Sequence, residues 1–349
     1  MTRSRVMFTT ASGLGHVHPV IPLARAAEAA GDEVMFAVPA EAEQTIRRFD
    51  FRALTVPYGD PAEIGRAWSQ LPREGRNTYV VADIFIGIHG RAARPAIQEA
   101  LTEFKADLMI STDLAALVAA EVAGVPSAYL GITALDLDDL DHARVIDAVD
   151  DLRLEAGLQR SGRMPYENGS RYLSAVPPLL WQDPQRLPAD WIWFRHEDPE
   201  GPVQPVAPAS TNRPRVYATL GSVAGANSFG RPVFHDLASA LGRTEADVLL
   251  TVGPFETGQL VDVPANVRVS AYEAQAVAMQ CDVVVTHAGA GTTVAALSRG
   301  LPVVAIPMFA DQMHNADRLA TAGLGLRIEP GQLISDLPAA VETVLTDPS

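Results

Sequence analysis

Cysteine and lysine are almost missing from this sequence of 349 residues, and each scarcity excludes a class of protein. Cys281 is the only cysteine, so the chain can form neither an internal disulfide nor a cysteine-rich zinc site, and we expect a reducing, cytoplasmic location. Lys105 is the only lysine, because 26 of the 27 basic residues are arginine. It lies in Phe104-Lys-Ala-Asp-Leu, which is neither a Gly-Lys-Ser/Thr phosphate loop nor a pyridoxal-binding motif. Enzymes that depend on such a lysine are therefore excluded.

Positive charge and long apolar runs are also scarce. The chain has 27 basic and 42 acidic side chains, a net charge of −15. Such a surface repels phosphate backbones, so we expect neither nucleic acid nor an anionic membrane as a partner. No apolar run approaches the roughly 18 residues of a membrane span, and residues 1–10 lack the apolar core of a signal peptide. We therefore predict no membrane span.

Hydrophobic residues are abundant, at 48% of the chain, which suits two domains of about 150–200 residues each. Short apolar runs alternate with helical patterns, which is typical of βαβ units around parallel sheets. Residues 201–214 contain four prolines and separate two such series. We predict a first domain at 1–200, a linker at 201–214 and a second domain at 215–349. The predicted strands are 6–10, 34–37, 108–111, 128–130, 216–220, 248–252, 267–270, 283–286 and 303–306, and the predicted helices are 19–30, 92–104, 114–123, 232–241, 273–279, 292–299 and 312–321.

Two glycine-rich loops follow predicted strands, where parallel sheets bind their ligands. The first, Ser12-Gly-Leu-Gly-His16, presents a histidine in a tight turn. A dinucleotide-dependent oxidoreductase also has such a loop, but His18 stands where its third glycine belongs. The second, His287-Ala-Gly-Ala-Gly-Thr292, leads into a helix whose N-terminus suits a pyrophosphate, although a tight turn used only for packing has the same spacing.

The sequence after the second loop favours one class of protein over the oxidoreductase and over a turn used only for packing. Val304-Ala-Ile-Pro-Met-Phe-Ala-Asp311-Gln312-Met-His-Asn315-Ala-Asp-Arg-Leu resembles the donor-binding signature of family 1 nucleotide-sugar glycosyltransferases. With the second loop, it resembles the branch that decorates antibiotics and related polyketides. Residues 13–16, 215–222 and 263–269 are also similar, whereas residues 58–200 match only loosely. The resemblance implies the GT-B fold, an α/β architecture in which two doubly wound Rossmann-like parallel-sheet domains face each other across a cleft.

The resemblance also implies a role for individual residues. His16 would be the general base that deprotonates an acceptor hydroxyl, and Asp113 would hold it and balance the imidazolium. Tyr272 would stack on the nucleobase in place of the family's usual tryptophan. The implied nucleotide and diphosphate site consists of Ser222, Tyr272, Gln275, His287, Gly289, Ala290, Gly291 and Thr292, and the implied sugar site of Asp311 and Gln312.

One departure from the family pattern bears on the donor. Relatives that use UDP-sugars commonly carry a glutamate, three residues after the position of Thr292, that binds both ribose hydroxyls; here that residue is Ala295. A deoxyribose has no 2′-hydroxyl to bind. We therefore expect a dTDP-sugar, with a deoxygenated sugar, in preference to a UDP-sugar. The implied reaction is inverting and metal-independent transfer to a hydroxyl of a hydrophobic natural-product acceptor, such as a polyketide aglycone.

We predict no cofactor and no metal. Asp136-Leu-Asp138 reads as an acidic helix start, and His16-Val-His18 has no third ligand nearby. Gly221-Ser-Val-Ala-Gly225 is not a nucleophile elbow, because its serine is not central. Apolar residues that could line the acceptor site, or equally belong to the core, are Trp68, Tyr79, Phe85, Ile86 and Ile88.

The alternatives left open are the oxidoreductase and a non-catalytic nucleotide-binding homologue. We also leave a homodimer open. Chains of the family usually continue into a C-terminal helix that crosses back to the first domain. The sequence given stops at Thr346-Asp-Pro-Ser349, so that either it is truncated or this crossing helix is missing.

Overall fold

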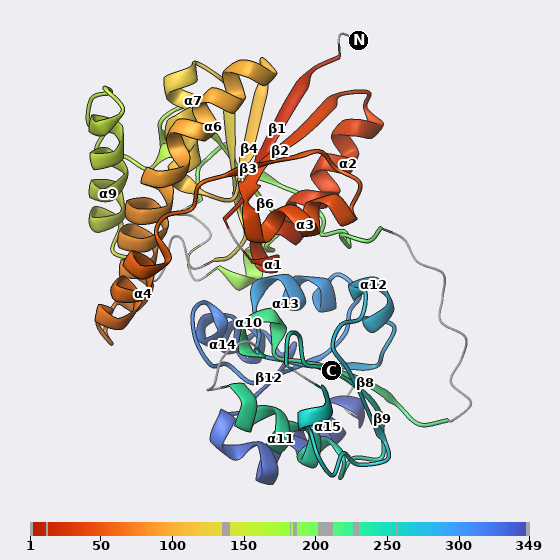
Figure 1. Cartoon of the computed structure of the whole chain (residues 1–349). Coiled ribbons are helices and arrows are strands. Elements are labelled where there is room, and N and C mark those ends of the chain that lie inside the picture. The colour runs from red at the N-terminus through yellow and green to blue at the C-terminus, as the bar shows by residue number, and fades with distance from the viewer. Residues whose placement is uncertain are drawn as a thin grey trace. The chain divides into compact units, whose positions relative to one another are not determined.

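The computed structural model describes residues 3–11, 13–134, 140–181, 183, 187–201, 212–225, 230–255 and 257–346, with the side chains of 230 and 231 left out. The chain forms two compact units, each with its own parallel sheet (Figure 1). The first unit is Met1–Ala175 with Asp183–Phe194, and the second is Val176–Gln182 with Arg195–Ser349. Residues 176–182 and 195–200, which we predicted in the first domain, therefore belong to the second unit. Of the predicted linker, residues 202–211 lie outside the described residues.

The first unit has one parallel sheet with the strand order β3-β2-β1-β4-β5-β6-β7. Its strands are β1 (Arg5–Thr9), β2 (Glu33–Pro39), β3 (Ala53–Val56), β4 (Leu108–Ser111), β5 (Ser127–Gly131), β6 (Arg171–Ser174) and β7 (Ile192–Trp193). Its helices are α1 (Leu14–Val17), η1 (His18–Val20), α2 (Ile21–Ala29), α3 (Ala40–Arg48), α4 (Pro61–Gln70), α5 (Arg76–Tyr79), the π-helix η2 (Val80–Gly90), α6 (Arg91–Phe104), α7 (Leu114–Ala123), α9 (His142–Glu155) and η3 (Pro165–Glu167).

Helices cover both faces of this sheet, with α2 and α3 on one face and α6 and α7 on the other (Figure 1). The central strand β1 is buried from Val6 to Thr9, which explains why it reads as a continuous apolar run rather than an alternating one. β1 pairs in parallel with β4, so that Thr9 lies beside Ser111 at the carboxyl edge. The Thr9 hydroxyl donates to Ser111 Oγ at 2.7 Å. The loops after these two strands therefore begin at the same place.

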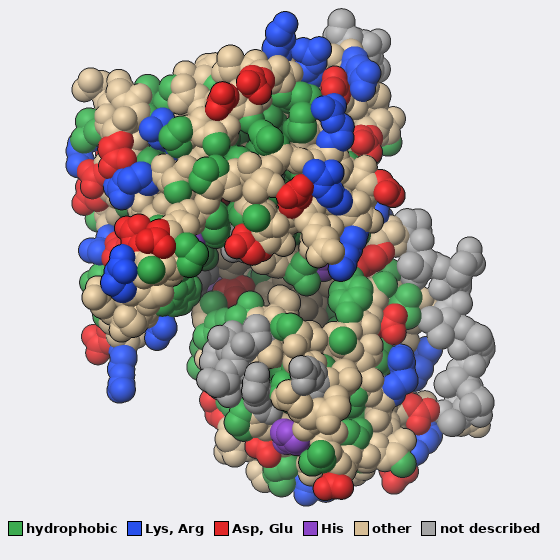
Figure 2. Space-filling model, viewed as in Figure 1, with side chains coloured by type: hydrophobic (Ala, Val, Ile, Leu, Met, Phe, Trp, Pro, Cys, Tyr) green, Lys and Arg blue, Asp and Glu red, His purple; other side chains and the backbone are tan. Residues whose placement is uncertain are grey.

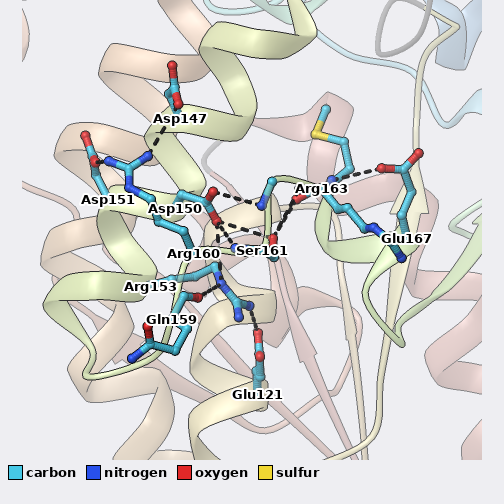
Figure 3. A network of polar contacts seen from close by, with 12 residues as sticks. Glu121, Asp147, Asp150, Asp151, Arg153, Gln159, Arg160, Ser161, Arg163 and Glu167 are labelled. Carbon is cyan, nitrogen blue, oxygen red and sulfur yellow. Dashed lines mark hydrogen bonds and ion pairs between the residues drawn. The ribbon is translucent and has the colours of Figure 1, made fainter.

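A buried polar network attaches the loop after α9 to its helix (Figure 3). Asp150 is 2% exposed and accepts hydrogen bonds from the backbone N–H groups of residues 161 and 162, at 2.8 and 3.0 Å. Arg153, also buried, donates to the carbonyl of Gln159 at 2.9 Å and pairs with Glu121 of α7. Each buried charge thus has partners, as burial requires, and the loop is held against α9 and α7.

The second unit has a parallel sheet with the strand order β10-β9-β8-β11-β12-β13. Its strands are β8 (Arg215–Thr219), β9 (Asp247–Thr251), β10 (Val267–Ser270), β11 (Val283–Thr286), β12 (Val303–Ala305) and β13 (Gly325–Arg327). Its helices are η4 (Pro178–Leu180), α10 (Gly221–Ala224), α11 (Gly230–Leu241), η6 (Thr257–Gln259), α12 (Gln275–Ala278), α13 (Ala290–Leu297), α14 (Gln312–Thr321), η7 (Pro330–Gln332) and α15 (Leu333–Thr346).

The core of this unit lies between the sheet and the helices α11 and α15. These helices contribute Phe234, Leu237, Leu333, Leu337 and Val341, all at most 1% exposed, to a cluster with the central strands. The first strand, β8, pairs with β11 so that Thr219 lies beside Thr286. The loops after β8 and β11 consequently face each other, which places the sequence-predicted donor residues at one edge.

The surface mixes the two signs of charge. On the face shown in Figure 2, acidic and basic side chains are interspersed over both units. Within the described residues, no helix is long and apolar enough to cross a membrane.

Candidate functional site

The loop after β11 closes around the imidazole of His287. Gly221 has a left-handed φ of 73°, and a Cβ there would lie 2.7 Å from His287 Cε1. A Cβ on Gly289 would lie 2.4 Å from His287 Nε2. Real Cβ atoms do not approach this closely, so the two glycines make room for the ring. Ala288, which lies between His287 and Gly289 in the sequence, adopts a left-handed φ of 63° that turns the chain into α13. The loops after β8 and β11 are therefore shaped around one side chain.

His287 is neutral at pH 7. Burial lowers its pKa to about 4, and the carbonyl of Thr219 opposes this effect as a hydrogen-bond acceptor. The Thr286 hydroxyl lies 3.1 Å from Nδ1. Beside this ring, the first turn of α13 presents N–H groups that the helix itself does not satisfy. A neutral imidazole has a single N–H, and the Thr219 carbonyl accepts it, so the groups that can donate to an anion here are the N–H groups at the positive end of the helix. The residues predicted for the diphosphate around this point are Ser222, Gly289, Ala290, Gly291 and Thr292.

Asn315 joins the loop after β11 to the loop after β12. It lies on α14 and is fully buried. Its amide nitrogen donates to the carbonyl of Ala288 and to Asp311 Oδ2, both at 2.9 Å. The sequence motif contains Asn315, but we predicted no role for it. The four-residue spacing from Asp311 on one helix could have indicated the second contact; the first joins residues 27 apart, and no local pattern indicates it.

Gln312, predicted to bind the sugar, has its side-chain oxygen engaged within its own loop. Oε1 accepts from the backbone N–H of Met308 at 2.9 Å and of Phe309 at 3.1 Å, and the residue is 3% exposed. These bonds close the turn in which Ala310 adopts a left-handed φ of 57°. Asp311, the other predicted sugar ligand, is only partly buried and is oriented by Asn315. Sugar binding by both residues stays a prediction.

Tyr272 and Gln275, which we predicted to bind the nucleoside, contact residues 196–200, for which we predicted no role. Tyr272 is 56% exposed, and its hydroxyl donates to Glu200. Gln275, the first residue of α12, has its Oε1 3.1 Å from Nε2 of His196. Both partners precede the predicted linker, more than 70 residues away in the chain, and neither belongs to a motif that could have marked it.

In the first unit, His16 and Asp113 lie at one edge of the sheet. His16 lies in α1 after β1, and Asp113 is the N-cap of α7 after β4. The rings of His16 and Phe85 meet edge to face, with centroids 5.9 Å apart. Burial lowers the pKa of His16 to about 4. Burial also raises the pKa of Asp113 to about 6, although the N–H of Ala115 favours the carboxylate.

The structure does not join His16 to Asp113 by a hydrogen bond. Asp113 Oδ1 accepts from the backbone N–H of Ala115 at 2.9 Å, which caps α7. His16 Nδ1 is buried and has no hydrogen-bond partner within the described ranges. Ser111 fixes the turn instead, because its hydroxyl oxygen accepts from the N–H of Asp113 at 2.9 Å. His16 and Asp113 thus follow two neighbouring strands of one sheet, but no hydrogen bond joins their side chains.

The residues predicted to line the acceptor site fall into different environments. Ile86 is 1% exposed and belongs to the core, whereas Trp68 on α4 is 41% exposed. Phe85, on the π-helix η2, is the one that contacts His16. Asp136 and Asp138, weighed as metal ligands, lie outside the described residues. Among the residues that are described, no group of three or more His, Cys, Asp or Glu side chains could hold a metal ion.

Comparisons with known proteins agree with this architecture. Residues 235–349 match the family described as erythromycin biosynthesis protein CIII-like, C-terminal domain. The L-demethylnoviosyl transferase of Streptomyces niveus is 26% identical over 343 residues, which cover 93% of this chain and 85% of that protein. The crystal structure of the glycosyltransferase SnogD from Streptomyces nogalater is similar with a TM-score of 0.74 and 25% identity, covering 99% of this chain and 94% of SnogD.

A further solved structure is that of the spinosyn rhamnosyltransferase SpnG complexed with thymidine diphosphate. It has a TM-score of 0.78 and 22% identity, and the match covers 98% of this chain and 92% of SpnG. Together with the two Rossmann-like sheets, these matches identify a glycosyltransferase of the GT-B fold. The matched proteins come from antibiotic and other natural-product biosynthesis, the branch that the sequence resembles. The matched proteins are glycosyltransferases, so they give no support to the oxidoreductase alternative.

Proposed function

We propose that this glycosyltransferase transfers a deoxygenated sugar from a dTDP-sugar to a hydroxyl group of a hydrophobic natural product, with inversion and without a metal ion. The observation that carries the choice of donor is Ala295. It lies on α13, is fully buried, and has only a methyl group where a ribose-binding glutamate would offer a carboxylate. A deoxyribose loses nothing at such a position, whereas a ribose leaves its 2′-hydroxyl without that partner. The thymidine diphosphate bound in SpnG supports the same choice.

The leaving group would be stabilised by the donor loops. As the bond between the anomeric carbon and the diphosphate breaks, negative charge grows on the phosphate oxygen. The backbone N–H groups at the N-terminus of α13, held beside the His287 ring, are fixed in place before the reaction, so they stabilise that charge with little reorganisation. They can do so without a divalent cation. The chain's net charge of −15 makes such local donors necessary.

The attacking group would be activated by His16. Its imidazole is neutral at pH 7 because its pKa is lowered to about 4. It takes the proton of the acceptor hydroxyl while that oxygen attacks the anomeric carbon from the side opposite the diphosphate, which inverts the configuration. The ionised Asp113, at the same sheet edge, would stabilise the imidazolium that forms. The aromatic edge of Phe85 beside His16 suits an apolar acceptor.

The donor is tested by calorimetric titration of the purified protein with dTDP and with UDP. We expect dTDP to bind about 3- to 10-fold more tightly, the equivalent of one hydrogen bond. Mass spectrometry of reactions between a panel of dTDP-sugars and aglycone polyketides then detects transfer, and NMR of the product gives the anomeric configuration. Turnover should be unchanged by EDTA. Tighter binding of UDP, retention of configuration or loss of turnover in EDTA would each contradict one part of the proposal.

A further inference from the structure

The segment before the predicted linker, residues 195–200, packs on the nucleoside side of the second unit. We call it the strap. Its outward residues are exposed, with side-chain exposures of 78% for Arg195 and 66% for Glu197. Its inward residues are buried, with side-chain exposures of 13% for His196 and 10% for Asp198. This alternation shows that one side of the strap is fitted against the unit and the other is open to solvent.

His196 orients Gln275. The ring nitrogen Nε2 lies 3.1 Å from Gln275 Oε1, so the N–H donates to the amide oxygen and directs the amide nitrogen away from the strap. Burial lowers the pKa of His196, which keeps the ring neutral at pH 7. A glutamine side chain has three rotatable bonds, and a buried partner removes much of that freedom. Gln275 is therefore held in one orientation before any ligand binds.

Glu200 and Asp198 fix the rest of the strap. The hydroxyl of Tyr272 donates to Glu200 Oε1, which holds a ring that is otherwise 56% exposed. Asp198 pairs with Arg299, whose Nη1 also donates to the carbonyl of Ala295 at 3.1 Å. The strap is thus attached at three points: to the residue predicted to stack on the base, to Gln275, and to the C-terminal end of α13.

We propose that the strap is the outer wall of the nucleoside site, and that His196 and Glu200 are positioning residues for donor binding. They act through Gln275 and Tyr272. The inference rests on the proposed function, because it takes a nucleoside diphosphate as the ligand. Since the strap contacts the nucleoside residues and not the loop of His287, it should affect the affinity for the nucleoside and leave the affinity for the diphosphate unchanged.

The test compares His196→Leu with His196→Asn and Glu197→Leu in the full chain. Leucine removes the hydrogen bond to Gln275, asparagine can restore a donor, and Glu197 is the exposed neighbour in the same strap. Calorimetry measures dTDP binding, inhibition by inorganic pyrophosphate reports on the diphosphate loop, and thermal melting checks the fold. We expect His196→Leu to weaken dTDP about 5- to 10-fold with pyrophosphate inhibition unchanged. It should raise KM for the dTDP-sugar and leave kcat within about twofold.

The two controls make the result specific. His196→Asn should recover most of the affinity for dTDP, and Glu197→Leu should bind it like the wild type. Equal dTDP affinity in His196→Leu and the wild type would overturn the inference, as would equal losses of dTDP and pyrophosphate affinity. If the wild-type protein does not bind dTDP at all, the proposed function fails instead, and the two failures are thereby distinguished.

Discussion

The donor loops and the loops after β1 and β4 differ in how their polar side chains are held. In the second unit, Gln312 bonds to the backbone of its own loop and Asn315 to that of the neighbouring loop, and two glycines enclose His287. In the first unit, Thr10 Oγ1, Thr112 Oγ1 and His16 Nδ1 are buried at one sheet edge with no hydrogen-bond partner in the described part of the chain. Buried polar groups are normally satisfied. Thr293 Oγ1 and Asn315 Oδ1 of the second unit also lack a partner among the described residues. The contrast is therefore that side chains bond the predicted donor loops to the backbone, whereas Nδ1 of the predicted base His16 has no such bond.

Among the variants that test this contrast, His16→Ala should have the largest effect. Because a general base contributes about 10²- to 10⁴-fold, we expect transfer to fall by that factor, while dTDP affinity stays within about twofold of wild type. Product formation by mass spectrometry and calorimetric dTDP binding measure the two effects. Retained transfer would reject His16 as the base. A parallel loss of dTDP binding would show that the two halves are not separable.

Asn315→Ala should damage the donor half. It removes the amide donor to the Ala288 carbonyl and to the Asp311 carboxylate and opens a cavity, so we expect the free energy of unfolding to fall by about 2–3 kcal/mol. Donor binding should weaken as well. Denaturant unfolding measures the first effect. Met313→Ala is the control, because Met313 lies on the same helix and is 40% exposed; its effect should stay within about 0.5 kcal/mol. Similar losses in both variants would contradict the role of Asn315.

The pH profile of transfer tests the proposed catalytic roles in the first unit. In the proposed mechanism Asp113 acts as a carboxylate, and its pKa is raised to about 6, so the active form would be lost as the pH falls through about 6. His16 is protonated only near pH 4 and adds a second loss there. We expect kcat/KM to fall about tenfold per pH unit below pH 6. Asp113→Asn should be slower and should lack the decline near pH 6. A decline that persists in this variant would assign it to another group.

The smallest expected effect is a difference in stability between alanine substitutions at two glycines of one loop. Gly289→Ala places a methyl group against the His287 ring and should reduce the free energy of unfolding by about 1–3 kcal/mol. A Cβ on Gly291 meets nothing within 4 Å. Gly291→Ala should therefore increase stability by up to about 1 kcal/mol, since alanine favours the helix. Thermal or denaturant unfolding of both variants gives the comparison. A destabilised Gly291→Ala would show that the loop is more crowded than described.

Sequence patterns predicted the central strands well, because buried parallel strands are apolar runs with sharp ends. The strands predicted at 108–111, 267–270 and 283–286 have the observed bounds of β4, β10 and β11. Other elements were not predicted, because their sequences are short or carry no strong periodic pattern. β13 has only three residues, and β7 consists of two exposed ones. The π-helix η2 is apolar without a helical period that would reveal it.

The candidate site shows the same limit. Loop motifs indicated His287 and Asp311 because glycines and a specific signature surround them. The partners of these residues were not indicated, since Asn315, His196 and Ser111 act through contacts that only the fold creates. The observed domain boundary differs from the predicted one for this reason as well. Residues 195–200 have no apolar pattern, and they lie in the second unit, where His196, Asp198 and Glu200 contact residues distant in the sequence.

The amide group of Asn315 has a thermodynamic consequence. One nitrogen bonds both to the turn that follows β11 and to the carboxylate that begins α14. A displacement of α14 would therefore loosen the loop predicted to bind the diphosphate and the predicted sugar ligand Asp311 together. Energetic effects at these two positions should then be non-additive, so that a double-mutant cycle between Gly289 and Asp311 has a coupling energy that disappears when Asn315 is replaced.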